Sequence, residues 1–189
     1  EGAANDMTVE ETYAWKNGTE GEVAACCNEG ASALWFYSPF FYRDREDLTP
    51  GVRHTFLLAG LALGLRRALL DEMTVTEGPD YERYVAEWLS RHPGSTRLDV
   101  PQLTVDLKGA RILMPGEIAS EYQIRVPVTS VEEMTFRDEK VYMLIVEFGL
   151  NTPNPLRFPL YAPERVCKLV PQAGDEIDAI IWLQGRIID

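Results

Sequence analysis

The sequence has few of the residues that hold metals or build disulfide frameworks: three cysteines and two histidines in 189 residues. Three cysteines at irregular spacing are too few for the cross-linked scaffold of a small secreted domain. The 14 glycines and 12 prolines are an ordinary share, which excludes collagen-like and low-complexity chains. The longest apolar run, residues 56–65, is about half the length that spans a membrane. These absences predict a soluble, folded chain.

Basic residues are also scarce, with 18 against 30 acidic ones and a net charge of −12. A field of this sign repels phosphate backbones, so the composition disfavours nucleic acid as a partner and favours a basic protein. The first residues lack the basic end and apolar stretch of a signal peptide, and free thiols suit a reducing compartment. The sequence therefore predicts a cytoplasmic protein, with a cleaved signal peptide as the open alternative.

Familiar catalytic motifs are missing from the sequence. It has no phosphate-binding loop, no dinucleotide fingerprint, no serine between two glycines and no Cys-x-x-Cys pair. One nucleophilic arrangement is conceivable, with Cys26, Cys27 or Cys167 beside His54 and an aspartate, but cysteines in an apolar strand usually pack as small hydrophobes. We therefore assign no catalytic, cofactor-binding or metal-ligating residue and expect no cofactor.

Hydrophobic spacing predicts one clear helix and many strands. Residues 79–91 have apolar side chains at helical spacing behind Pro79, and a shorter helix is expected over residues 7–16. Residues 52–70 fit either a helix or a buried strand that ends near Leu65. Strands, including an early hairpin that turns at residues 28–30, are expected over residues 22–27, 32–37, 103–107, 111–114, 122–128, 140–148, 156–161 and 176–188.

Two stretches repeat the same order of features. Residues 37–39 read Tyr-Ser-Pro, and residues 161–163 read Tyr-Ala-Pro; each follows an apolar strand. A proline and a glycine then precede a second apolar run, at residues 50–51 in the first stretch and at residues 171–174 in the second. A strand, a surface connector and a turn into the next strand would give this pattern, so we consider an internal duplication, with coincidental turn residues as the alternative.

The segment at residues 174–187 resembles the closing strand of a small barrel such as an OB-fold, because a Gly-Asp turn enters a final hydrophobic strand. We therefore predict an α+β protein that is predominantly β, with two small barrel-like units joined by a helix. An OB-like barrel is one architecture that each unit could have. The predicted divisions are an N-terminal segment at 1–20, a first β unit at 21–70, the linking helix at 71–97 and a second β unit at 98–189. The alternative is that all four segments pack as one compact domain.

An unusual aromatic cluster lies at residues 35–42, with six aromatic side chains in eight positions. Alternation along a strand sends half of them to each side, so either both faces are covered or some rings form a binding surface. Charged residues at 43–47 would supply the polar rim of such a surface. The candidate interaction residues are Trp35, Phe36, Tyr37, Phe40, Phe41, Tyr42, Arg43 and Arg45.

These observations favour a non-catalytic protein-binding module, such as an adaptor, an inhibitor or an immunity-like protein. Two alternatives stay open. One is an OB-like binder of oligonucleotides or small ligands that stacks them on Trp35, Tyr37 or Trp182. The other is an enzyme of unrecognised type. The sequence does not predict the oligomeric state.

Overall fold

The computed structural model describes residues 3–29, 33–149 and 151–188, and it is mostly β. The chain divides into two compact units. We call residues 1–68 with 111–189 the body and residues 69–110 the insertion. Segments from both ends of the sequence therefore belong to the same unit.

Five strands of the body pair in a closed order, β1–β2–β3–β12–β4 and back to β1. All these pairings are antiparallel except β3 with β12, which run parallel and meet at Tyr37 and Gln184. The short helix α1 (Phe41–Asp44) lies between β3 and β4 in the sequence. The bounds of the strands are β1 (Ala4–Ala14), β2 (Gly21–Cys26), β3 (Leu34–Ser38), β4 (Arg53–Arg67) and β12 (Glu176–Ile187).

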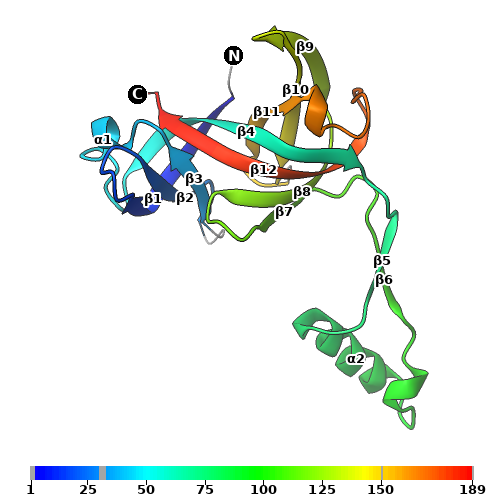
Figure 1. The fold of residues 1–189 in the computed structure, drawn as a ribbon. Helices are drawn as coiled ribbons and strands as arrows, with labels where there is room; N and C mark the ends of the chain where they lie inside the picture. Colours follow the sequence, from blue (N-terminus) through cyan, green and yellow to red (C-terminus); the bar gives the residue numbers. More distant parts are fainter. Residues whose placement is uncertain (1–2, 30–32, 150, 189) are drawn as a thin grey trace. The chain divides into compact units, whose positions relative to one another are not determined.

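The other strands of the body extend the sheet outward from β4 and β12. β8 pairs antiparallel with β12, and β11 pairs parallel with β4 (Figure 1). The body therefore has two halves, one with β1, β2 and β3 and one with β7 to β11, and β4 and β12 contribute to both. A short 3-10 helix, η2 (Glu164–Val166), follows β11. The remaining strands are β7 (Ile112–Pro115), β8 (Glu121–Pro127), β9 (Ser130–Phe136), β10 (Glu139–Phe148) and β11 (Leu156–Pro163).

The hydrophobic core of the body is continuous through both halves. It includes Phe36 and Phe56 on one side and Phe158 and Leu160 on the other, all almost fully buried. β4 contributes to both regions: Phe56 packs against Phe36, whereas Gly60 lies beside Leu160. Because the one long strand β4 lies in both halves, they share a single core.

The insertion contains the two-stranded ribbon β5 (Glu72–Val75) and β6 (Leu103–Asp106). Between them lie the helix α2 (Pro79–Arg91) and a 3-10 turn, η1 (Arg97–Asp99). The predicted helix at residues 79–91 is confirmed, with Pro79 in its first turn and His92 as its C-cap.

Most predicted strands of the body are present within a few residues. The helix predicted over residues 7–16 is wrong, because this segment is β1, whose Asn5, Met7 and Val9 are buried at alternate positions. Residues 53–67 form one strand, which resolves the choice between helix and strand there. Two further strands, β5 and β9, are not expected from the sequence. Gly30 and residue 32 of the predicted hairpin lie outside the described residues.

Candidate functional site

The aromatic cluster predicted from the sequence divides into a buried part and an exposed part. Phe36, Tyr37 and Phe41 are buried and Trp35 is half-buried. The exposed members are Phe40 at 44%, Tyr42 at 59%, Arg43 and Arg45. Alternation in the strand accounts for only part of this division. The exposed residues lie beyond Ser38, where the chain leaves β3 and turns into α1.

The buried rings of β3 are held by specific contacts. Tyr37 lies between Trp15 and Trp182, with ring centroids 5.1 Å and 4.8 Å away. Its hydroxyl donates a hydrogen bond to the Glu20 carboxylate, and burial together with this carboxylate raises the pKa of Tyr37 to about 12. A ring packed on both sides has no free face on which a base could stack.

Trp35 is fixed through its backbone by a residue of β8. The Trp35 N–H donates to the Tyr122 hydroxyl at 2.7 Å, and this hydroxyl donates to the Trp35 carbonyl at 3.0 Å. Burial raises the pKa of Tyr122 to about 12. The tyrosine therefore satisfies both backbone groups of Trp35, as a neighbouring strand would.

The exposed part forms a small ridge on α1 in which arginines lie over aromatic rings. The Arg43 guanidinium carbon is 4.8 Å from the centre of the Phe40 ring, and that of Arg45 is 4.5 Å from the Tyr42 ring. Such cation–π pairs contribute about 0.5–1 kcal/mol at exposed sites and hold flexible arginines in place. We call Phe40, Tyr42, Arg43 and Arg45 the α1 ridge.

The α1 ridge is anchored from below by buried residues. Phe41 packs on β2 at Gly21, where a Cβ atom would lie 2.6 Å from the Phe41 ring. The Tyr42 N–H donates to the Thr19 carbonyl at 3.1 Å, and Leu48 is buried just after the helix. The position of the ridge is therefore set by the core of the body.

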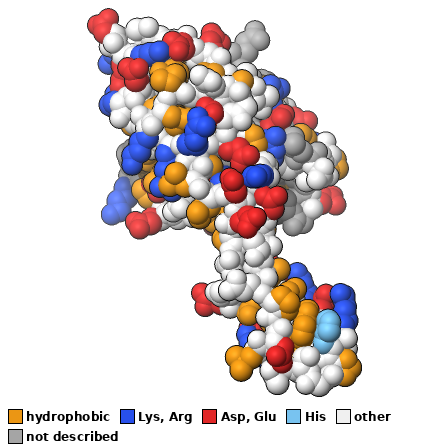
Figure 2. All heavy atoms as spheres, turned by 90° about the vertical axis from the view of Figure 1, so that its right-hand side faces the viewer, with side chains coloured by type: hydrophobic (Ala, Val, Ile, Leu, Met, Phe, Trp, Pro, Cys, Tyr) orange, Lys and Arg blue, Asp and Glu red, His pale blue; other side chains and the backbone are white. Residues whose placement is uncertain are grey.

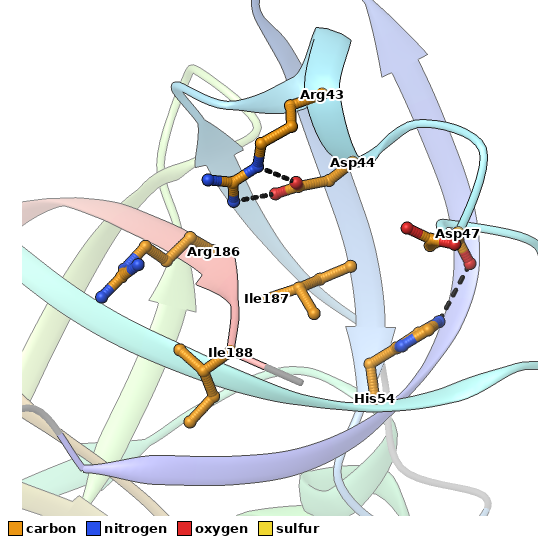
Figure 3. Close-up of a pocket in the computed structure, with 7 residues that line it drawn as sticks. All are labelled: Arg43, Asp44, Asp47, His54, Arg186, Ile187 and Ile188. Carbon is orange, nitrogen blue, oxygen red and sulfur yellow. Dashed lines mark hydrogen bonds and ion pairs between the residues drawn. The ribbon is translucent and has the colours of Figure 1, made fainter.

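A hollow of about 590 Å³ adjoins α1 (Figure 3). The Arg43 guanidinium binds the Asp44 carboxylate through two hydrogen bonds, one of them 2.9 Å from Nη2 to Oδ2, and these bonds raise the pKa of Arg43. A ring nitrogen of His54 lies 2.9 Å from the backbone carbonyl of Asp47. Arg186 has no ion pair with a described residue. The hollow is lined by Arg43, Asp44, Asp47, His54, Arg186, Ile187 and Ile188.

A second hollow of about 280 Å³ is more apolar, with Pro159 and Tyr161 from β11 in its lining. Phe40 and Arg186 also line it, and Arg186 is common to both hollows. The α1 ridge and the end of β12 therefore form one surface with apolar and charged parts. Arg186 and Ile187 could not be predicted as part of this surface from the sequence, because only the pairing of β12 with β4 brings them to α1.

The thiols are unfavourable as nucleophiles in this fold. Burial raises the pKa of Cys27 to about 11 and also raises the pKa values of Cys26 and Cys167, so all three stay protonated near neutral pH. Cys26 is opposite Thr8, which is opposite Arg53, so this thiol lies about two strand spacings, roughly 10 Å, from β4 and its His54. In the described part of the chain, no three histidine, cysteine or acidic residues are grouped to hold a metal.

Comparisons with protein-family models, curated proteins and solved structures find no match for this chain. Neither helix of the described residues is long and apolar enough to cross a membrane.

Proposed function

We propose that this protein is a non-catalytic protein-binding module and that the α1 ridge is its binding surface. One observation carries the proposal. Phe40 and Tyr42 are exposed, each is covered by an arginine, and both are held on a helix whose intervening Phe41 is buried. Aromatic residues and arginine are the types most enriched at the centres of protein interfaces.

The charges around the ridge suit a protein partner better than a nucleic acid. Arg43, Arg45 and Arg186 are offset by Asp44, Glu46 and Asp47, so the surface has no basic excess with which to bind a phosphate backbone. The net charge of −12 acts at longer range and favours encounter with a basic protein. The contact itself would then depend on the rings and on acceptors for the arginines.

We further propose that the body consists of two OB-like barrels that arose by duplication and share β4 and β12. The order β1–β2–β3–β12–β4, with α1 between the third and fourth strands, is the order of an OB-fold. The sequence repeat supports the duplication. The parallel contacts join Tyr37 to Gln184 and Leu61 to Tyr161; Tyr37 and Tyr161 are 124 positions apart, and Leu61 and Gln184 are 123 apart.

A small-ligand binder of OB type is the second candidate, and the hollow of about 590 Å³ beside α1 favours it. Its two arginines and two aspartates would suit a ligand with both cationic and anionic groups. Stacking of an oligonucleotide on Trp35 or Tyr37 is less favourable, because the first is half-buried and the second is packed between two rings.

The test is affinity capture from native cell lysate with two tagged variants. We expect the double variant Phe40→Ala and Tyr42→Ala to lose a stoichiometric partner that the wild type retains, since hot-spot aromatics each contribute about 2 kcal/mol or more. Phe136→Ala is the matched control, because Phe136 is 64% exposed and also has an arginine, Arg137, over its ring. Circular dichroism checks that all variants are folded.

Equal capture of the same protein by the wild type and the α1 double variant would refute the α1 ridge as the site. If none of the chains captures a protein, the small-ligand candidate takes precedence. A thermal-shift screen of metabolites with the wild type and Arg186→Ala then tests it, because a ligand of the hollow would stabilise only the wild type.

A further inference from the structure

The insertion has very little core of its own. Within residues 69–110, all of which the structure describes, the buried hydrophobic side chains are Val85 and Leu107. Leu98 is 96% exposed, and hydrophobic side chains gather on the surface of this unit in Figure 2. A two-stranded ribbon is at best marginally stable in water, and a unit of about 40 residues rarely folds on one small core. The insertion therefore has apolar surface available for a partner.

The β5–β6 ribbon has an apolar face and an acidic face. Met73 is opposite Val105, and Val75 is opposite Leu103, so these four side chains share one face. Met73 and Val105 are 47% and 39% exposed. Among the described residues neither strand has a second neighbour, so both edges of the ribbon are unpaired there. An unpaired edge can accept another strand by backbone hydrogen bonding.

On the other face, Glu72 is directly opposite Asp106. Two like charges at directly opposed positions destabilise a strand pair. No ion pair joins either carboxylate to a basic residue in the described part of the chain, and all four basic residues of the insertion bind other acids. Those four ion pairs are Arg83–Asp80, Arg91–Glu87, Arg97–Glu82 and Lys108–Asp71.

From this arrangement we infer that the β5–β6 ribbon accepts an extended segment of a partner protein as a third strand, and that this segment alternates apolar and basic residues. Its apolar side chains would cover Met73 and Val105. Its lysines or arginines would lie on the opposite face and neutralise Glu72 and Asp106. This site is separate from the α1 ridge and does not depend on it.

A second copy of the chain is a poor occupant of the same edge. The insertion has eight acidic and four basic residues, and a copy of β5 or β6 would place Glu72 or Asp106 near the same carboxylates. The charges therefore select a basic strand over self-association.

The experiment uses the full chain and synthetic eight-residue peptides. A peptide of alternating lysine and valine is compared with one that has its four lysines before its four valines, and with one of alternating glutamate and valine. We expect only the first to slow amide hydrogen exchange at residues 72–75 or 103–106. The double variant Glu72→Gln and Asp106→Asn should weaken its binding by about tenfold, whereas Glu132→Gln on the edge strand β9 should not.

Loss of folding cannot explain a weaker affinity of the double variant, because removal of the like-charge pair should stabilise the free ribbon. Equal protection by the block peptide would overturn the inference, since simple charge attraction would then suffice. Unchanged affinity of the double variant would also overturn it. So would dimerisation through the ribbon in analytical ultracentrifugation. Unchanged binding of the alternating lysine–valine peptide by the variant Phe40→Ala would show that this site is independent of the α1 ridge.

Discussion

Gly185 on β12 is a residue whose lack of a side chain matters for the core. A Cβ atom there would lie 2.5 Å from the Phe36 ring and 2.7 Å from Leu58 Cδ2, both of which are buried. Gly64 on β4, the strand paired with β12, has no heavy atom within 4 Å of the same position. Two glycines in paired strands therefore have opposite tolerance for a methyl group.

We expect Gly185→Ala to lower the free energy of unfolding by about 2–3 kcal/mol, because Phe36 and Leu58 must shift to accept the methyl group. Gly64→Ala should change it by no more than about 0.5 kcal/mol. Urea unfolding followed by tryptophan fluorescence measures both values. Similar losses in the two variants would show that Phe36 and Leu58 do not crowd a methyl group at position 185.

The residues of the candidate surface could be predicted only in part from the sequence. Residue types identified the cluster at residues 35–42, and alternation indicated that part of it is buried. The exposure of Phe40 and Tyr42 depends on the turn after Ser38 and on the space that Gly21 leaves for Phe41. Neither condition is visible in the local pattern, because Gly21 belongs to a different strand.

The helix α2 is an element that the sequence alone could identify. Its apolar residues repeat at helical spacing, and Pro79 marks its start. Two carboxylates then hold the segment that follows. Arg97 Nη1 donates a hydrogen bond to Glu82 Oε2 at 3.0 Å. Asp99 accepts hydrogen bonds from the backbone N–H and the hydroxyl of Thr96. These bonds lower the pKa values of Glu82 and Asp99.

The pKa shifts predict acid sensitivity of the insertion. A carboxyl group with a lower pKa in the folded state stabilises that state above its ordinary pKa, 4.5 for Glu82 and 3.8 for Asp99. This contribution is lost as the pH falls through the lowered values. We expect the protection of amides at residues 79–99, measured relative to the intrinsic exchange rate at each pH, to fall below about pH 4, and less steeply in the variant Glu82→Gln with Asp99→Asn. Identical pH profiles would exclude this role for the two carboxylates.

β1 illustrates the opposite case, in which the local pattern misleads. A threonine followed at the third position by a glutamate matches a helix start, yet residues 4–14 form a strand between β2 and β4. Burial of Met7 and Val9 on one face of this strand outweighs the local signal. Propensity is a weak prior wherever two neighbours supply backbone hydrogen bonds.

The body as a whole depends on the pairing of β4 with β12, which are more than 100 residues apart in the sequence. β12, from the C-terminal part of the chain, completes the half that contains β1, β2 and β3. β4, from the N-terminal part, completes the half that contains β7 to β11. Neither end of the chain therefore has a complete set of strands. The two halves should fold only together.

We expect the separate fragments 1–70 and 111–189 to lack cooperative thermal unfolding, and an equimolar mixture to recover it. A chain in which about eight Gly/Ser residues replace residues 69–110 is the control and should fold. Arg66 is opposite Asp178, which is opposite Arg125, which is opposite Ile112, so the linker spans three strand spacings, about 14 Å. Cooperative unfolding of either fragment alone would contradict the shared-strand arrangement.

The sequence by itself determined the β-rich class, the helix at residues 79–91 and the positions of most strands, because hydrophobic periodicity and turn residues act over short distances. Tertiary structure decided which strands pair, which rings of the cluster are exposed and that Arg186 lies beside α1. It also decided that Glu72 is opposite Asp106. These features depend on register between segments far apart in the chain, and register is set by packing of the whole core and not by any one segment.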